Sequence, residues 1–293
     1  MGRQISKRSR VVAGRRGSET VRPTAKSKVA AYNADLQTPF SRAPVDIIIP
    51  FHGQYKLVLE LVESIWRGTR SNPYQICLVD DCSGNDEFIS KFESHKHPEG
   101  FYENNVMPLR TEERLGFGGA LRYGFERTKQ PWVVFLNSDC VADDPLWMIE
   151  MGRALLELKS QNVRMVSARM DKPPEGSHPA LEGTMGERGE NIIMTAKDPA
   201  LPFVCTMCHR ELFSKVGGFV KEYPLGMYED EEFAFRMKRH GFKQAIAGRS
   251  YITHLGGKTF EQELKVNPEA PKILDENRLR CIQDLKELVK KEG

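Results

Sequence analysis

Polar and acidic side chains recur in this sequence where an apolar run stops. The segment Pro131–Cys140 reads PWVVFLNSDC, in which five large apolar residues are followed by Asn137, Ser138 and Asp139. Carboxylate and amide oxygens at the carboxyl end of a buried strand suit a divalent cation and a phosphate-bearing ligand. A simple turn explains the same three residues equally well, because Asn, Ser and Asp all favour turns.

Four consecutive acids, Glu229 to Glu232, form a second candidate cluster just before Phe233. Acids in the first turn of a helix offset the positive end of the helix dipole, which accounts for one or two of them. Four adjacent carboxylates repel one another, so we expect at least one of them to face a site. Its neighbours would raise its pKa toward values that suit a general base.

His254 is the third candidate, because two glycines follow it in the run His254–Gly257. A single histidine is more often structural than a ligand. A neutral imidazole beside two glycines could still approach a metal–diphosphate group closely.

Short apolar runs separated by helical patterns must position these side chains. Buried strands are predicted at Val45–Ile49, Gln75–Val79, Val106–Leu109, Trp132–Leu136, Val163–Ala168 and Gln244–Ile246. Strands that alternate with helices through short links predict an α/β, Rossmann-like fold, with a mostly parallel sheet flanked by helices.

Helices are predicted between the strands from apolar residues spaced three and four apart. They are Tyr55–Trp66, a helix ending near Phe92, a helix opened by Gly116–Gly119, Leu212–Phe219 and Glu229–His240. Residues 170–200 are rich in Pro, Gly and charge and predict a functional loop or lid. From Pro271 onward the apolar spacing predicts a C-terminal amphipathic helix packed on the body.

The carboxyl ends of parallel strands meet at one edge of a sheet, so polar residues that follow several strands can converge on one ligand. Asp80–Asp81 can accept hydrogen bonds from a nucleobase or a ribose, and Arg114 or Arg122 can neutralise a diphosphate. A divalent cation at Asp139 would do the same. The glycine run Gly116–Gly119 is too short to distinguish ligand binding from a turn.

The bulk composition is that of an ordinary globular protein. The chain has 293 residues, 40% apolar and 28% charged, which fits one large domain with or without extensions. It contains no apolar run of the roughly 18–20 residues that cross a bilayer, and its start lacks an apolar signal core, so we expect a soluble cytoplasmic protein without a transmembrane segment. Its six cysteines include one CxxC, Cys205–Cys208, without the second pair typical of zinc sites, and we expect reduced thiols.

The first 28 residues are strongly basic, with nine Lys or Arg residues and a single acid, Glu19. The remainder has 34 basic and 39 acidic residues, so the body is mildly acidic. Such a segment predicts a disordered arm attracted to polyanions, either nucleic acid or an anionic membrane surface. A transit peptide and a solvated tail are the other interpretations.

The ordered motifs VDIIIPFHG, LVDDCSGND, RLGFGGALRYG, FLNSDC, VGGF, YEDEEFAFRMKRHGF and HLGG resemble those of the family-2 glycosyltransferases, which have the GT-A fold. The resemblance covers residues 44–260 and divides the chain into a basic arm at 1–43, a GT-A domain at 44–260 and a C-terminal helical extension at 261–293. One departure is Asn137, which stands where the family's DxD motif has its first Asp.

The resemblance implies roles for the candidate residues. Asp230 would be the catalytic base, with Glu229 beside it, and Asp139 with His254 would hold Mn²⁺ or Mg²⁺. The expected nucleotide-sugar-binding residues are Pro50, Phe51, His52, Asp80, Asp81, Arg114, Gly118, Asn137, Ser138 and Asp139.

The implied activity is inverting transfer of a hexose or pentose from a UDP-, dTDP- or GDP-sugar to an acceptor hydroxyl. A glycan or a lipid-linked sugar is the default acceptor. The basic arm suggests a nucleic-acid acceptor instead, such as a hydroxymethylated base of phage-type DNA, flipped out of the duplex. A non-catalytic nucleotide-binding protein is a further alternative. A sugar-nucleotide pyrophosphorylase is disfavoured, since PFHGQYK lacks the glycine-rich basic signature expected after the first strand.

Overall fold

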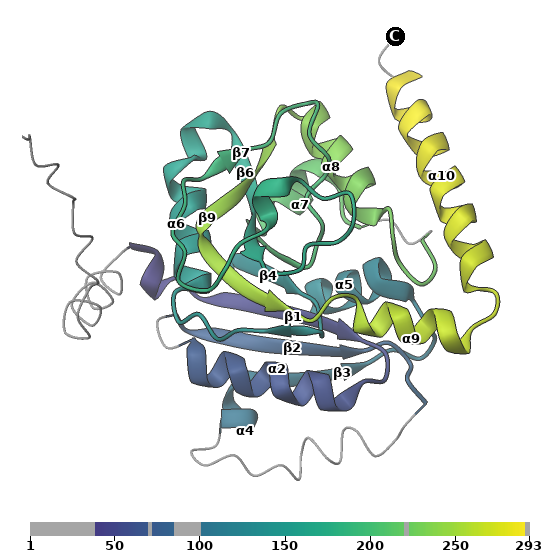
Figure 1. Ribbon diagram of the computed structural model, residues 1–293, viewed down its shortest axis with the longest axis horizontal. Coiled ribbons are helices and arrows are strands. Elements are labelled where there is room, and N and C mark those ends of the chain that lie inside the picture. Colours follow the sequence, from purple (N-terminus) through teal and green to yellow (C-terminus); the bar gives the residue numbers. More distant parts are fainter. Residues whose placement is uncertain (1–38, 70–71, 85–100, 220–222, 291–293) are drawn as a thin grey trace, which may run out of the picture.

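The computed structural model describes residues 39–69, 72–84, 101–219 and 223–290. Within these ranges, nine strands form one sheet in the order β3-β2-β1-β4-β8-β6-β9-β5, and β7 pairs with β9 (Figure 1). The strands are β1 (Val45–Phe51), β2 (Tyr74–Asp80), β3 (Val106–Arg110), β4 (Trp132–Leu136), β5 (Cys140–Val141), β6 (Val163–Met170), β7 (Ile192–Ile193), β8 (Cys205–His209) and β9 (Lys243–His254).

The sheet is parallel in one half and mixed in the other. β3, β2, β1 and β4 run parallel, with Ile47 opposite Ile76 on one side and Val134 on the other. β8 is antiparallel to both β4 and β6, whereas β9 is parallel to β6. The predicted α/β fold with a central sheet is therefore confirmed, and its parallel character is concentrated in the half that carries Asp80 and Asn137.

Helices cover both faces of the sheet. They are α2 (Tyr55–Gly68), α4 (Phe101–Asn105), α5 (Gly116–Arg127), α6 (Trp147–Glu157), α7 (Glu211–Val216), α8 (Glu229–Arg239), α9 (Lys258–Val266) and α10 (Ala270–Lys290), with short 3₁₀ turns at Pro39–Arg42, Lys159–Gln161 and Pro179–Leu181. β1 shows why two layers are needed: Ile47 and Ile49 face the core beneath α2 and α6, and Ile48 faces the core beneath α5, α7 and α8. Because successive side chains of a strand point to opposite faces, an unbroken apolar run produces a sheet buried on both sides.

Several elements differ from their sequence prediction. β8 and α6 were not predicted, and β9 continues to His254 instead of ending at Ile246. The helix expected to end near Phe92 and the basic arm as far as residue 38 lie outside the described residues. The CxxC residues lie on β8, where Cys205 packs in one core and Cys208 in the other, so their side chains point to opposite faces.

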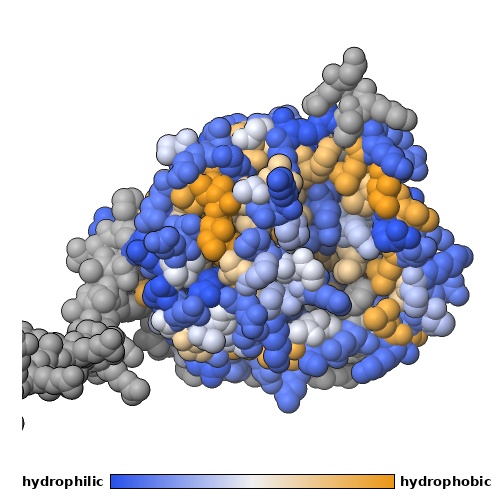
Figure 2. Space-filling view, turned by 45° about the horizontal axis from the view of Figure 1, so that its top comes forward, coloured by the Kyte–Doolittle hydropathy of each residue, from blue (hydrophilic) through white to orange (hydrophobic). Residues whose placement is uncertain are grey.

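The C-terminal segment forms two helices outside the main layers. α9 follows the end of β9, and α10 packs on α8 and α9 at one edge of the molecule (Figure 1). α10 confirms the predicted C-terminal helix but leaves Leu279 and Ile282 largely exposed. Apolar residues of this kind form separate patches between hydrophilic ones on the face seen in Figure 2. None of the helices in the described part of the chain is long and apolar enough to cross a membrane.

Candidate active site

A cavity of about 440 Å³ lies at the carboxyl ends of β1 and β4, between the loop at 174–177 and the start of α8. Every predicted site residue except Asp80 and Gly118 lines it. Those that do are Pro50, Phe51, His52, Asp81, Arg114, Asn137, Ser138, Asp139, Glu229, Asp230 and His254. Asp139 and Asp230, which are far apart in the sequence, therefore face one common space.

Asp139 and His254 are brought together by strand pairing. Cys140 of β5 lies opposite His254 of β9 in the antiparallel register, so the residue before Cys140 meets the end of β9. Asp139 Oδ1 lies 3.5 Å from His254 Nε2, and both residues are 3% exposed. The backbone N–H of Lys258, which opens α9, donates to Asp139 Oδ2 at 2.9 Å. The site thus forms where β9 ends and α9 begins.

The electrostatics of this pair are mutual. Burial raises the pKa of Asp139, but the nearby His254 imidazole and the Lys258 N–H outweigh burial and hold that pKa below its usual range. Burial lowers the pKa of His254, but Asp139 and the Lys172 carbonyl raise it by more, so the pKa of His254 lies above its usual value. A protonated imidazole and the carboxylate would stabilise each other, and a cation bound to the neutral ring would supply the same positive charge.

The donor atoms fit a divalent cation. His254 Nδ1 lies 2.6 Å from the carbonyl oxygen of Lys172 and must donate to it, which leaves the lone pair of the neutral ring on Nε2. That Nε2 is buried, has no hydrogen-bond partner and faces a carboxylate oxygen. One imidazole nitrogen and one carboxylate suit Mn²⁺, and the carboxylate suits Mg²⁺. No group of three or more His, Cys, Asp or Glu ligands occurs within the described ranges, so the remaining ligands would come from substrate or water.

The second chemical group is the acid pair at the start of α8. Glu229 is 5% exposed, and its Oε2 is buried without a hydrogen-bond partner. Burial, together with the charge of Glu231, raises the pKa of Glu229 from 4.5 to about 7. Asp230 is partly exposed at the cavity wall, and its enclosure there, with the neighbouring carboxyls of Glu231 and Glu229, raises its pKa well above the usual value. A carboxyl with a raised pKa suits a general base that works near neutral pH.

Three of the residues that line this cavity each carry a buried polar atom without a hydrogen-bond partner. These atoms are Asn137 Oδ1, Glu229 Oε2 and His254 Nε2. Native proteins satisfy nearly all buried polar atoms, so such a group commonly marks a place where a ligand supplies the missing partners.

Asp81 has a structural partner that the sequence did not indicate. Its Oδ1 accepts the backbone N–H of Leu115 at 2.7 Å and its Oδ2 accepts that of Gly116 at 2.9 Å. Asp81 therefore caps the start of α5, where no local side chain does so. Burial still raises the pKa of Asp81, with the two N–H groups acting against it. The Asp81 carboxylate lines the cavity, and both of its oxygens accept backbone N–H groups of the chain itself.

Asp80 and Gly118 do not line the cavity. Asp80 accepts hydrogen bonds from the backbone N–H and the hydroxyl of Ser83, and its other oxygen lies 3.7 Å from Arg110 Nε. It shapes the loop after β2. Gly118 is buried inside α5.

Arg114 lines the cavity but is paired with the C-terminal segment. Its Nη1 and Nη2 donate to the two oxygens of Glu263 at 3.1 and 2.6 Å. Arg114 and Asn267 hold the pKa of the Glu263 carboxyl below its usual range against the effect of burial. Sequence reasoning missed Glu263, because nothing in its local sequence distinguishes it from any other helix acid.

Further lining residues come from loops that carry no recognisable motif. Residues 174–177 belong to the predicted functional segment at 170–200, and they line the cavity together with Pro199, Pro202 and Met227. The Pro-rich composition of residues 170–200 was the one feature of the sequence that predicted this part of the cavity lining.

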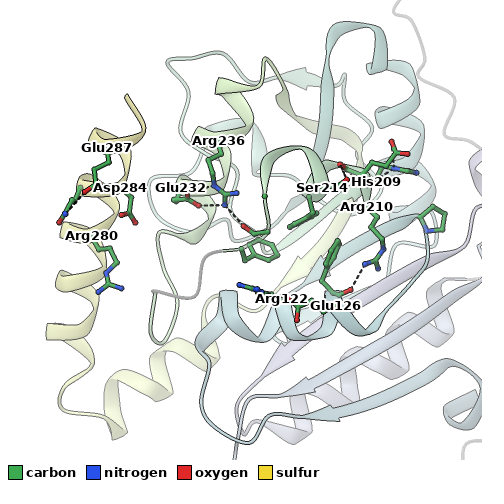
Figure 3. Close-up of a pocket in the computed structure, with 18 residues that line it drawn as sticks. Arg122, Glu126, His209, Arg210, Ser214, Glu232, Arg236, Arg280, Asp284 and Glu287 are labelled. Carbon is green, nitrogen blue, oxygen red and sulfur yellow. Dashed lines mark hydrogen bonds and ion pairs between the residues drawn. The ribbon is translucent and has the colours of Figure 1, made fainter. Parts of the chain in front are cut away.

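A larger groove of about 1410 Å³ lies between α10 and the helices α5, α7 and α8. Figure 3 shows Arg280, Asp284 and Glu287 of α10 across it from Arg236 of α8. Its arginines serve the fold: Arg236 holds Glu232 and the carbonyl of Val216, and Arg122 holds Glu126. Charges of both signs line it, so it lacks the electrostatic character of an anion site.

The fold and the site together define a GT-A glycosyltransferase architecture. Solved structures with this arrangement include GalNAc-T7 with UDP, GalNAc and Mn²⁺ (TM-score 0.58, 16% identity, 73% of this chain and 44% of that one). They also include the mannosyltransferase PcManGT of Pyrobaculum calidifontis with GDP-Man and Mn²⁺ (TM-score 0.52, 16% identity, 89% and 80%).

Residues 46–217, more than half of the chain, match the glycosyl transferase family 2, and the chain belongs to that family. An uncharacterized glycosyltransferase of Haemophilus influenzae is 25% identical over 66% of this chain and 61% of its own length. The O-antigen biosynthesis protein RfbC of Myxococcus xanthus is 22% identical over 72% of this chain. The similarity covers 17% of the length of RfbC and 61% of the Haemophilus protein, so this chain corresponds to only part of each relative.

Proposed function

We propose that this protein is an inverting glycosyltransferase that moves a sugar from a nucleoside-diphosphate sugar to an acceptor hydroxyl. The observation that carries the proposal is the single cavity lined at once by the Asp139–His254 pair and by the Glu229–Asp230 pair. The first pair suits a metal-bound diphosphate, and the second suits a proton acceptor.

The chemistry assigned to the acid pair is proton removal. Asp230 takes the proton from the acceptor hydroxyl, the acceptor oxygen forms a bond to the sugar C1, and the bond from C1 to the phosphate oxygen breaks with its electrons. The nucleoside diphosphate leaves, and attack from the face opposite the leaving group inverts the anomeric carbon. Burial and the Glu231 carboxyl raise the pKa of Asp230, and the adjacent charge of Glu229 adds to that increase.

Asp139 and His254 are assigned to a divalent cation, Mn²⁺ or Mg²⁺. When bound, such a cation neutralises the charge that develops on the departing diphosphate. Asp139 offers Oδ1 and His254 offers its unpartnered Nε2, while the N–H of Lys258 fixes the other carboxylate oxygen. The Asn137 amide, with its unpartnered Oδ1, is assigned to the donor sugar or its diphosphate.

The donor is proposed to be a UDP-, dTDP- or GDP-sugar carrying a hexose or pentose, and the acceptor a glycan or a lipid-linked sugar. The nucleic-acid acceptor remains a prediction from residues 1–28, which lie outside the described part of the chain. A purely nucleotide-binding protein is disfavoured, because it has no use for two adjacent carboxyls of raised pKa in the ligand cavity.

The test is a hydrolysis and transfer screen of UDP-, dTDP- and GDP-sugars with and without Mn²⁺. We expect Mn²⁺-dependent release of one nucleoside diphosphate. In the Asp230→Asn variant we expect unchanged donor binding and transfer lowered at least about a hundredfold, the usual contribution of a positioned base. Near-normal transfer by this variant would remove Asp230 from the role of base.

A further inference from the structure

α10 holds the turn that leads into the catalytic acids. Asn277 Nδ2 donates to the carbonyl oxygens of Pro224 and Gly226, both at 2.8 Å. Asn277 is 2% exposed, so these two hydrogen bonds are made away from water. Both hydrogens of the Asn277 amide group are therefore donated to a turn that lies 51 to 53 residues earlier in the chain.

The backbone of this turn is unusual. Leu225, Met227 and Tyr228 have φ angles of 67, 73 and 76°, and Gly226 has a φ of 117°. Residues with a Cβ disfavour the left-handed region, and three of them here adopt it within four positions. Such a conformation persists only where surrounding contacts impose it.

The turn is enclosed from two sides. A Cβ on Gly116, at the start of α5, would lie 2.8 Å from the Leu225 nitrogen, and a Cβ on Gly226 would lie 2.9 Å from that of Phe117. On the other side the Tyr223 hydroxyl donates to Asp284 Oδ2 of α10 at 3.0 Å. The glycines permit the close approach of α5 to the turn, and α10 provides its polar contacts.

The position of the turn gives it a role in the site. Tyr228 is the residue before α8 and supplies no side-chain cap, so the direction in which Glu229 and Asp230 enter the cavity depends on the backbone at 225–228. Leu225, Gly226, Met227 and Tyr228 themselves line the cavity. A shift of this turn would move the carboxyls of Glu229 and Asp230 relative to Asp139. Within the described part of the chain, Asn277 makes no hydrogen bond to the Asp139 part of the cavity.

We propose that Asn277 is a positioning residue for the acid pair, acting through the strained turn at 225–228. This inference rests on the proposed function, since it assigns Glu229 and Asp230 to proton removal. It extends the working part of the enzyme to α10, beyond the segment 46–217 that matches the family.

The experiment compares Asn277→Asp, Asn277→Ala and Asn277→Gln with the matched control Lys272→Ala, which lies on the same helix with its side chain 73% exposed. Asn277→Asp keeps the shape but places carboxylate oxygens against two carbonyls. For Asn277→Asp and Asn277→Ala we expect kcat to fall about tenfold to a hundredfold, which is the loss that a displacement of about 1 Å of a catalytic group causes. The Kd values for the nucleoside diphosphate and for Mn²⁺ should stay within about twofold of the wild-type values. Asn277→Gln, which keeps the NH₂ group, should recover part of kcat, and Lys272→Ala should match wild type.

Hydrogen–deuterium exchange of the amides at 224–231 provides a readout independent of turnover. We expect faster exchange in this segment for Asn277→Ala and unchanged exchange in β1 and β4. If kcat is unchanged, or if donor binding falls in proportion to kcat while exchange rises throughout the sheet, the proposal is overturned. If Asn277→Asp does not fold, Asn277→Gln decides by the same criteria. If the wild-type protein turns over no sugar nucleotide, the proposed function fails, and the exchange data still decide whether Asn277 holds the turn.

Discussion

The raised pKa values of Glu229 and Asp230 predict how turnover depends on pH. Protonation removes the base, so kcat should fall as pH drops through the apparent pKa of the pair. For the Glu229 carboxyl, with a pKa of about 7, one tenth of the carboxylate remains at pH 6 and about 3% at pH 5.5. Burial and the neighbouring carboxyls raise the pKa of Asp230, the proposed base, in the same direction, so we expect turnover to fall at least about tenfold between neutral pH and pH 5.5. An ordinary glutamate of pKa 4.5 would still be about nine tenths ionised at pH 5.5.

The assay is the initial rate at saturating donor and acceptor and fixed free Mn²⁺ between pH 5 and 9. Because the two carboxyls interact, the profile reports an apparent pKa of the pair and not of either residue alone. Glu229→Gln removes one of the charges that raise the pKa of Asp230, so its acid limb should move to lower pH while the plateau stays. Donor binding measured at the same pH values separates the base from the metal site.

Two results would refute this reasoning. One is a wild-type rate that stays flat down to pH 5.5, which would mean that no carboxyl of raised pKa limits turnover. The other is a Glu229→Gln profile with its acid limb unmoved, which would mean that Glu229 does not tune Asp230.

Three further predictions concern stability and metal binding. The pKa of Glu229 is higher in the folded protein, so the cost that its ionisation adds to folding grows as pH rises from about 4.5 to about 7. Glu229→Gln should therefore raise the free energy of unfolding at pH 8, by at most about 3 kcal/mol, and leave it unchanged near pH 4. Urea titrations at the two pH values measure this difference. Asp139→Ala should abolish the Mn²⁺ dependence of donor binding measured by calorimetry, and identical titrations with and without Mn²⁺ in the wild type would contradict the site. Arg210→Ala should lower the free energy of unfolding by about 3 kcal/mol, since it leaves the fully buried Asp46 without its charged partner at 3.0 Å. Arg122→Ala, which breaks an exposed i,i+4 pair on α5, is its control and should change stability by less than about 0.5 kcal/mol.

The parallel half of the fold could be predicted from the sequence because its strands are continuous apolar runs. Val45–Ile49 and Trp132–Leu136 were predicted within two residues of β1 and β4. β8 could not, because Cys205–His209 has neither an apolar run nor an alternating pattern, and its place depends on pairing with β4 and β6. Tertiary pairing decides such a strand, and local composition does not.

The residues of the candidate site likewise divide into those that local sequence predicts and those that only the tertiary structure brings in. Asp139 and His254 could be predicted because each follows a recognisable strand or motif, and the β5–β9 register places them together. Asp81 shows the limit of that reasoning: the sequence gives an acid at a strand end but not the N–H groups of Leu115 and Gly116 that bind it. Glu263 and Asn277 act across 149 and about 50 residues of chain, a separation at which local patterns carry no information.

The two contacts made by α9 and α10 bear on how this protein could be re-engineered. A chimera that joins residues 44–260 of this chain to the tail of a relative would keep the whole sheet and the side chains proposed to hold the metal. It would exchange Glu263, the partner of Arg114, and the amide that clamps the turn ahead of the acids. On the role proposed for Asn277, grafted tails would change turnover without any change at the residues proposed to perform the chemistry.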